Sequence, residues 1–442
     1  METTIKKAGK INQSITFKAL VIGFLTIILL IPGIMIQDLI RERQDRSVET
    51  IEKINAKWSN AQTICGPVLT IPYTTQVDAN NKTVLQEHTI SITPENLNID
   101  TQLFPEERYY GIYKTILYKS EIDLSGNFDK INYQKTDNST IHWDQAYLTI
   151  GVSDLRGITE NISFTLDNKQ YPVEAAGNYD RLMGKILVVS LNNADTLLTG
   201  QPLNFNCKLK LNGSSNINFI PIGKTSKVHV AGTWKSPGFI GNFSPEHTIT
   251  ENGFDANWSV LRFNRSIPET WIDNQVETFE DASFGVNLID PVNHYQQNMR
   301  SAKYAFMFIA LTFVVFFFVE ILTKKRIHPI QYLLVGIALI LFYSLLLSIS
   351  EQINFGIAYL IASIATIGLI TVYTHSIFKN KVQTGGLAAM LCMLYIFLYV
   401  VLQLEDIALL IGSVGLFIIL GIIMFFSRKI NWYRQEEETP ND

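Results

Sequence analysis

The chain has 442 residues, of which 47% are hydrophobic, and its formal net charge at pH 7 is -4. Nucleic-acid-binding proteins usually carry a basic patch or a high pI, so this charge predicts no nucleic-acid partner. Three cysteines are too few for a disulfide-rich fold or a zinc cluster. Whether Cys65 and Cys207 pair depends on a distance that sequence does not supply, so both alternatives stay open. Cys392 lies in an apolar run, which predicts a small packing residue.

Six apolar stretches predict six transmembrane helices. The first covers residues 18–38 and the other five lie within residues 304–426. Each is close to the length of about 20 residues that spans a bilayer core. No small-x-small cleavage site follows the first stretch, so we expect an uncleaved anchor helix and not a signal peptide.

The short links between the later stretches are sorted by charge. Basic residues follow the second, fourth and sixth stretches, whereas Glu351, Glu405 and Asp406 lie in the other links. Basic residues in short loops mark the cytoplasmic side. This predicts cytoplasmic termini (residues 1–17 and 427–442) and an external segment made of a helical extension (39–60) and a long domain (61–300).

The long external domain shows the alternation that is typical of strands. Residues 89–93 and 206–211 alternate between apolar and polar side chains, and turn signals such as Asn252-Gly253 separate similar runs. Alternation indicates sheets with one buried and one wet face, hence antiparallel pairing. The predicted fold is a membrane α-helical bundle of six transmembrane helices with a large all-β, sandwich-like domain inserted between helices one and two.

Catalytic and cofactor motifs are not found in the sequence. It contains no HExxH, CxxC or GxSxG motif and no glycine-rich phosphate loop. The five histidines of the external domain are not spaced as metal ligands. His142 and Asp144 lie two residues apart on a strand-like stretch, and we interpret them as strand surface. We therefore predict no catalytic, cofactor-binding or metal site, no cofactor and no enzymatic activity.

Four features remain as candidate polar sites. Asp154 and Arg156 lie in a charged turn after a strand, where they could form a buried ion pair. Glu320 lies near the end of the second apolar stretch, where it could pair with Lys324 or contact a partner or an ion. Arg326 and His328 precede Pro329, which is well placed to begin a helix, so this tract is interpreted as a connector between two helices. Glu351 lies in an external link, where it could dock the external domain.

These tracts carry a resemblance to a known family. The run Arg326-Ile327-His328-Pro329-Ile330-Gln331-Tyr332, with Gly66-Pro67-Val68-Leu69, Gly111-Ile112-Tyr113, Asp154-Leu155-Arg156-Gly157-Ile158 and Gly238-Phe239-Ile240-Gly241, resembles the CreD family. The motifs occur in order over almost the whole chain. The main departures are about ten extra residues at the N-terminus, a divergent middle domain and a divergent fifth helix.

The resemblance implies a multi-pass protein of the bacterial inner membrane that is tied to envelope integrity, envelope stress and a two-component regulon. The external domain is then periplasmic, and no catalytic residue carries over. A non-enzymatic scaffold or sensor is expected, whose partners are membrane lipids and a periplasmic protein, glycan or lipid. A transporter or flippase using Glu320 and Glu351 is the alternative. An envelope-polymer enzyme using Asp154, Asp144 and His142 is a further one.

Overall fold

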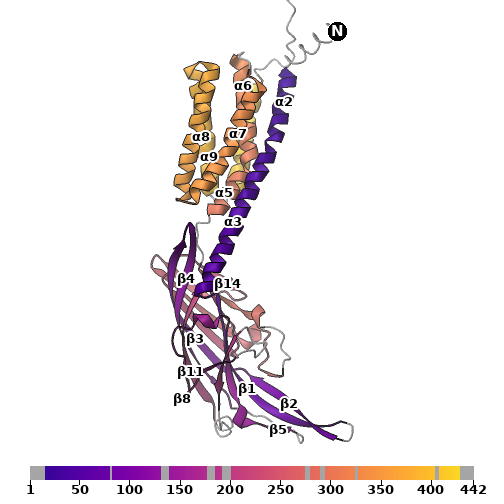
Figure 1. Ribbon diagram of the computed structural model, residues 1–442, viewed down its shortest axis with the longest axis vertical. Helices are drawn as coiled ribbons and strands as arrows, with labels where there is room; N and C mark the ends of the chain where they lie inside the picture. The colour runs from indigo at the N-terminus through magenta and orange to yellow at the C-terminus, as the bar shows by residue number, and fades with distance from the viewer. Residues whose placement is uncertain are drawn as a thin grey trace, which may run out of the picture. The chain divides into compact units, whose positions relative to one another are not determined.

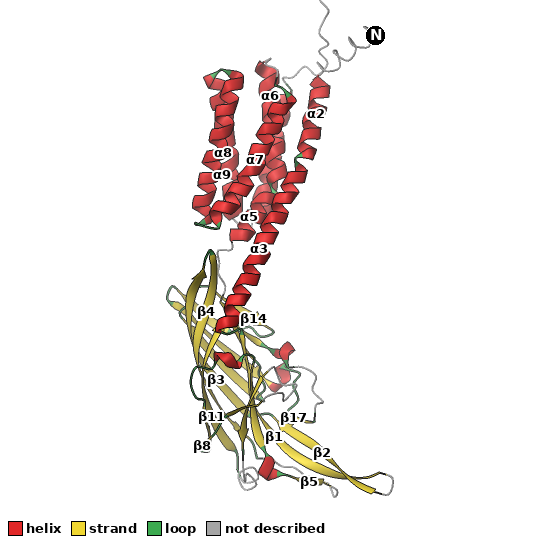
Figure 2. Cartoon of the chain, in the orientation of Figure 1, coloured by secondary structure: helices red, strands yellow, loops and turns green. Residues whose placement is uncertain are grey.

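The computed structural model describes residues 15–79, 82–130, 139–176, 185–191, 201–273, 279–288, 294–323, 327–403 and 408–428. The chain divides into two compact units, and the strands all lie in one of them, which also contains the end of α3 (Leu30–Trp58) (Figures 1 and 2). The helical unit is formed by Met1–Ser47 and Val292–Asp442, and the β-rich unit by Val48–Pro291.

The helix of the first predicted span continues into the predicted helical extension without a break at residue 38. The structure has α2 (Ile15–Ile28) and α3 (Leu30–Trp58), and α3 runs through the predicted boundary. Helical hydrogen bonds continue across the interruption, from Leu29 N to Leu25 O at 3.0 Å and from Gly33 N to Leu29 O at 3.2 Å. The interruption lies where Pro32, which has no N–H, leaves the carbonyl of Ile28 without its helical donor.

Helices occupy the remaining predicted stretches. They are α5 (His294–Lys303), α6 (Ala305–Thr323), α7 (Pro329–Ser350), α8 (Phe355–Phe378), α9 (Lys381–Gln403) and α10 (Ala408–Ser427). Among the described residues, four helices are long and apolar enough to cross a membrane: Phe17–Trp58, α7, α8 and α9. A fifth is added if α5 and α6, which meet at a bend of 42°, form one span.

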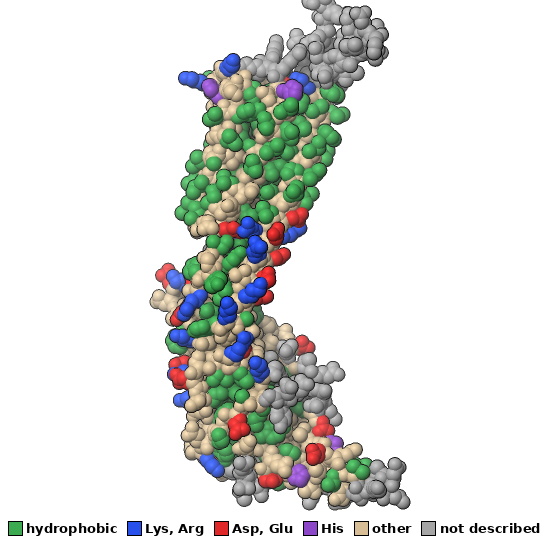
Figure 3. All heavy atoms as spheres, viewed as in Figure 1, with side chains coloured by type: hydrophobic (Ala, Val, Ile, Leu, Met, Phe, Trp, Pro, Cys, Tyr) green, Lys and Arg blue, Asp and Glu red, His purple; other side chains and the backbone are tan. Residues whose placement is uncertain are grey.

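Apolar side chains cover much of the surface of the helical unit between charged ends (Figure 3). One of them was not expected to be exposed: Cys392 lies on the surface of α9 and does not fill the packing role that was predicted for it.

The predicted β-rich range was too long at its end, since residues 294–300 belong to α5. Tyr295, Asn298, Ser301 and Ala302 are the buried residues of α5, which is helical spacing.

The β-rich unit contains two sheets. The ten-stranded sheet has β1 (Gln62–Ala79), β2 (Lys82–Ile92), β5 (Ser139–Ile141), β6 (Tyr147–Val152), β9 (Glu174–Ala176), β10 (Lys185–Ser190), β12 (Asn216–Phe219), β14 (Pro237–Gly241), β17 (Thr270–Ile272) and β18 (Phe284–Leu288). The eight-stranded sheet has β3 (Asn96–Tyr110), β4 (Tyr113–Phe128), β7 (Ser163–Leu166), β8 (Lys169–Tyr171), β11 (Leu203–Ser214), β13 (Thr225–Gly232), β15 (Glu246–Thr250) and β16 (Gly253–Leu261).

The sheets are mixed, so the prediction of purely antiparallel pairing is wrong for two pairs. β1 pairs with β12 in parallel, and β3 pairs with β13 in parallel. Each of these pairs joins strands that lie far apart in the sequence. Alternation of apolar and polar residues reports which face of a strand is buried and contains no information on the direction of its neighbour.

One hydrophobic core lies between the two sheets and draws buried residues from both. Phe284 of the ten-stranded sheet and Trp258 of the eight-stranded sheet meet there, with ring centroids 5.3 Å apart. Cys65 and Cys207 belong to the same core and are free thiols. Burial raises the pKa of each thiol to about 12, so neither is poised to react as a thiolate.

Candidate functional site

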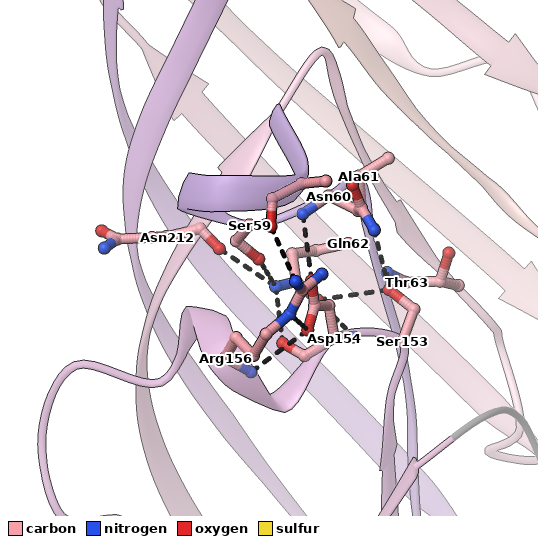
Figure 4. A network of polar contacts seen from close by, with 10 residues as sticks. Ser59, Asn60, Ala61, Gln62, Thr63, Ser153, Asp154, Arg156 and Asn212 are labelled. Atoms are coloured by element: carbon pink, nitrogen blue, oxygen red, sulfur yellow. Dashed lines mark hydrogen bonds and ion pairs between the residues drawn. The ribbon is translucent and has the colours of Figure 1, made fainter. Parts of the chain in front are cut away.

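A buried amide organises the point at which α3 ends and β1 begins (Figure 4). Gln62 is fully buried, and its Nε2 lies 2.9 Å from Ser59 Oγ and 3.0 Å from the carbonyl oxygens of both Asp154 and Asn212. Its Oε1 accepts a hydrogen bond from the backbone N–H of Asp154 at 3.2 Å. Gln62 therefore ties three segments that are distant in sequence to one another. The prediction from sequence missed it, because a lone glutamine at a strand start has no motif.

The predicted ion pair of the charged turn is present beside this amide. The guanidinium of Arg156 forms a bidentate salt bridge with the Asp154 carboxylate, with Nε to Oδ1 at 2.9 Å and Nη2 to Oδ2 at 2.6 Å. Asp154 Oδ2 also accepts from the backbone N–H of Asn60 at 3.1 Å. The third arm of the guanidinium donates to the carbonyl of Ala56 on α3 at 2.6 Å. We call Ser59, Gln62, Asp154 and Arg156 the α3 anchor.

The α3 anchor is built for attachment and not for proton transfer. The Asp154 side chain is only 5% exposed, and the hydrogen bond from Arg156 lowers its pKa to about 2. A carboxylate with that pKa that accepts four hydrogen bonds, three from Arg156 and one from the backbone N–H of Asn60, is a poor general base near neutral pH. Gly157 completes the packing, because a Cβ there would lie 2.4 Å from Asn212 O and 2.5 Å from Gln62 Nε2.

The other residues considered for catalysis do not join the anchor. His142 Nε2 lies 3.2 Å from Thr74 Oγ1, whereas Ser153 next to Asp154 accepts from Thr63 N at 2.9 Å. Thr63 and Thr74 are both on β1, about 35 Å apart at the usual rise per residue of a strand. Asp144 is exposed. Asp154 and His142 therefore cannot act on one substrate bond.

A different histidine bridges two carboxylates on the surface of the eight-stranded sheet. His229 on β13 lies 2.7 Å from Asp100 Oδ1 through Nδ1 and 2.8 Å from Asp255 Oδ2 through Nε2. Both carboxylates are acceptors, so both ring nitrogens must carry protons for both bonds to form. The two carboxylates raise the pKa of His229, although its partial burial opposes them.

Glu320 holds together three helices of the helical unit. Its carboxylate accepts from Lys18 Nζ on α2 at 2.5 Å, from Tyr332 Oη on α7 at 2.9 Å and from the backbone N–H of Ile327 at 3.1 Å. It is 5% exposed. The expected pairing with Lys324 lies outside the described residues. A buried carboxylate is costly unless it is paired, and these three donors supply the pairing.

His328 has a structural role at the start of α7. Its side chain accepts from Ile330 N while Gln331 Oε1 accepts from His328 N at 3.0 Å, which forms a capping box with Pro329 in the first turn. The interpretation of this tract as a connector that leads into a helix is confirmed from Ile327 onward. Arg326 lies outside the described residues.

Glu351 ends α7 and contacts partners within the helical unit. Tyr295 Oη on α5 donates to Glu351 Oε1 at 3.2 Å, and Arg43 Nη1 on α3 lies 3.9 Å from Oε2. The neighbouring Ser350 Oγ accepts from Asn298 Nδ2 at 2.7 Å. Glu320 and Glu351 thus each join three helices. Among the described residues, no group of three or more His, Cys, Asp or Glu side chains could hold a metal ion.

The α3 anchor generates a pH-dependent prediction. Asp154→Asn removes the charge while keeping the shape, and we expect a loss of up to about 2 kcal/mol of unfolding free energy at neutral pH. A carboxylate whose pKa is lowered stabilises the fold above its unfolded pKa near 3.8, and this contribution is lost as pH falls through about 2. Denaturant unfolding of the full chain in detergent, followed by tryptophan fluorescence, measures this loss.

The matched control for this substitution is Asp144→Asn, which changes an exposed acid and should leave the unfolding free energy unchanged. A loss for Asp154→Asn that is the same at neutral and strongly acidic pH would contradict the role of the charge.

His229 generates a prediction of opposite sign. Its raised pKa means that the stabilisation is fully present below the unfolded value near 6.5 and is lost as pH rises through the folded value. We expect His229→Gln to lower the thermal midpoint more at about pH 5.5 than at about pH 8.5. In a chain that carries Asp100→Asn and Asp255→Asn, the same change should have no pH-dependent effect. A uniform loss at both pH values would argue against the bridged imidazolium.

Comparison with solved structures gives weak likenesses. A mutant of the M1 zinc metallopeptidase from Deinococcus radiodurans is 8% identical, with a TM-score of 0.17 and coverage of 38% of each chain. A substrate-bound mutant of that protein is 9% identical, with a TM-score of 0.16 over 37% of this chain and 39% of that one. Likenesses this low support no conclusion about this protein.

Comparison by sequence is decisive. The family model described as "Inner membrane protein CreD" matches residues 14–433. Inner membrane protein CreD of Escherichia coli (strain K12) is 31% identical over 413 residues, which are 92% of this chain and 91% of that protein. Together with the apolar helices, these matches show that the chain belongs to the CreD family of inner membrane proteins.

Proposed function

We propose that this protein is a non-enzymatic scaffold or sensor of the inner membrane that supports the integrity or stress response of the cell envelope. The observation that carries this proposal is that the residues best suited to catalysis have structural roles. Asp154 and Arg156 are committed to holding α3, and His142 lies far from them. The β-rich unit then acts by binding a protein, glycan or lipid of the envelope.

The proposal includes an orientation. Basic residues follow α6, α8 and α10, whereas Glu351 and the pair Glu405-Asp406 follow α7 and α9. By the positive-inside rule, this pattern favours cytoplasmic termini and a periplasmic β-rich unit. The unit is inserted between the helix that contains residues 17–58 and the helices that begin at residue 294.

The test is photocrosslinking in cells from an exposed position of the β-rich unit. Lys208 is 69% exposed on β11, so a photoreactive residue there should leave the fold intact. We expect one discrete adduct with a periplasmic or outer-envelope component, since binding surfaces select few partners. A probe at Leu209, a buried neighbour on the same strand, is the matched control and should give no adduct. Adducts only with cytoplasmic proteins would contradict both the orientation and the binding function.

A transporter or flippase is the second candidate, and one observation favours it. An apolar groove of about 460 Å³ lies between α2 and α6, lined by residues that include Gly23, Thr26, Phe313 and Phe317. Its volume is in the range of small-molecule sites. Lys18 and Glu320 lie on these same two helices and supply polar groups.

Neutralising Glu320 and Glu351 separates the second candidate from the first. A transporter that uses these carboxylates should lose most of its activity in a complementation assay when Glu320→Gln or Glu351→Gln is introduced, because intramembrane ionisable groups mark ion and substrate pathways. Immunoblotting of membrane fractions checks that each variant accumulates normally. If both variants complement fully, the transporter candidate is excluded.

A further inference from the structure

The apolar groove of the helical unit lies between two contacts that fix α2 against its neighbours. α2 lies beside α6 and α7 (Figure 1). At one end of α2, Lys18 Nζ lies 2.5 Å from Glu320 Oε1 of α6. Just beyond the other end, the buried Leu29 packs on Gly336 of α7, where a Cβ would lie 2.2 Å from Leu29 Cδ1. The groove occupies the length of α2 between these two contacts.

The lining of the groove is apolar except at one residue. Thr26 is that exception, and its Oγ1 donates to Ile22 O, one turn earlier on α2, at 2.8 Å. A ligand with hydrogen-bonding groups along its length would lose its contacts with water here and gain few in return. The groove therefore selects a hydrocarbon.

Gly23 gives the groove its depth. A Cβ at this position would meet nothing within 4 Å, whereas a Cβ at Gly336 would clash with Leu29. Gly336 thus permits two helices to approach, but Gly23 leaves space beside α2. Ala19 and Ala310, which also line the groove, are small as well. The hollow therefore results from the choice of residues on both helices.

The dimensions of the groove match one acyl chain. On α6 the lining runs from Phe306 to Phe318, which is about 18 Å at the helical rise per residue. One leaflet of a bilayer contributes about 15 Å to the hydrocarbon core. The volume of about 460 Å³ is also in the range of pockets that hold one small ligand. An extended chain of a membrane lipid therefore fits along the groove.

The groove is accessible from the apolar surface of the helical unit. Leu20, Phe24 and Ile27 of α2 are each more than half exposed, and Phe306 of α6 is also exposed. Apolar side chains continue over the surface of the unit (Figure 3). In a span of this hydropathy, such side chains face lipid. A lipid chain can thus enter from the side without crossing a polar barrier.

A cation lies at one end of the groove. Lys18 directly precedes the lining residue Ala19, and Glu320 follows the lining residue Phe318 by two positions. The Lys18 side chain is 31% exposed, whereas that of Glu320 is 5% exposed. The ammonium is therefore the part of this ion pair that an external group reaches. It has three N–H donors, and among the described residues its partner Glu320 takes one of them.

We propose that the groove between α2 and α6 binds an anionic glycerophospholipid, with one acyl chain beside Gly23 and the phosphate of the headgroup at Lys18. A phospholipid combines the two features that the groove presents, a hydrocarbon chain and an acidic group at its end. Basic residues beside pockets between transmembrane helices recognise anionic headgroups in the same way. The bound lipid fills the space between α2 and α6. This proposal does not depend on the scaffold or sensor function, because lipid binding is measured without a partner of the β-rich unit.

The test is photocrosslinking from a lipid. The full chain is reconstituted in phosphatidylcholine vesicles that contain a small fixed fraction of phosphatidylglycerol with a diazirine in one acyl chain. Mass spectrometry then identifies the crosslinked peptides. We expect adducts to concentrate on the peptides of α2 and α6 that line the groove. Replacing part of the phosphatidylcholine by unlabelled phosphatidylglycerol should reduce these adducts at least about threefold, because the two anionic lipids compete by mass action.

Two glycine substitutions form a matched pair. Gly23→Leu fills the groove without a clash and should reduce the adducts on α2 and α6 to the level found on α8. Gly368→Leu is the control, since Gly368 is exposed on α8, a Cβ there also meets nothing within 4 Å, and it does not line the groove. Circular dichroism and the yield in membranes verify that both variants fold.

Substitutions at Lys18 test the headgroup contact. Lys18→Gln should abolish the competition by unlabelled phosphatidylglycerol, whereas Lys18→Arg keeps the charge and should preserve it. Competition that is unchanged in Lys18→Gln would overturn the assignment of the headgroup. Adducts spread over all helices in proportion to their exposure would show contact with bulk lipid only and would overturn the site, as would undiminished adducts in Gly23→Leu.

Discussion

The β-rich unit depends on the satisfaction of a few buried polar groups where α3 passes into β1. Gln62 and Asp154 are removed from water, and each would destabilise the fold if its partners were missing. Because their partners come from α3, the 3₁₀ turn Leu155–Gly157 and β11, these segments have one permitted arrangement. β1 then pairs with β2, β5, β6 and β12, so the placement of its first residue sets the register of the ten-stranded sheet.

The arrangement of the helical unit also depends on polar contacts between its elements, but on fewer of them. Most of its side chains are apolar, and hydrophobicity alone gives little preference for one helix neighbour over another inside a lipid bilayer. Glu320 with Lys18 and Tyr332, and Glu351 with Tyr295 and Arg43, are directional contacts. Each selects which helices meet. This structural role explains why both glutamates are placed among the helices without requiring that either binds an ion.

The polar residues of this protein therefore fall into two groups, those with structural roles and those on exposed surfaces. Asp154 and Arg156, which looked suited to chemistry in the sequence, hold elements together, whereas the exposed surface of the β-rich unit carries charged pairs, the bridged His229 and the exposed Tyr109 and Tyr110. A protein with this distribution interacts through its surfaces. Membership in the CreD family agrees with a place in the inner membrane and leaves the identity of the bound partner to experiment.

The sequence by itself determined the family, the apolar helices and the strand-rich character of the segment between them, because hydrophobic length and alternation are local properties that each segment displays alone. It also indicated the Asp154–Arg156 pair, since the two residues are neighbours. Only the tertiary structure decided that Gln62 joins them, that Lys18 pairs with Glu320 and that β1 and β3 acquire parallel partners. Those contacts join residues far apart in the chain, and their geometry arises only when the separate segments pack against one another.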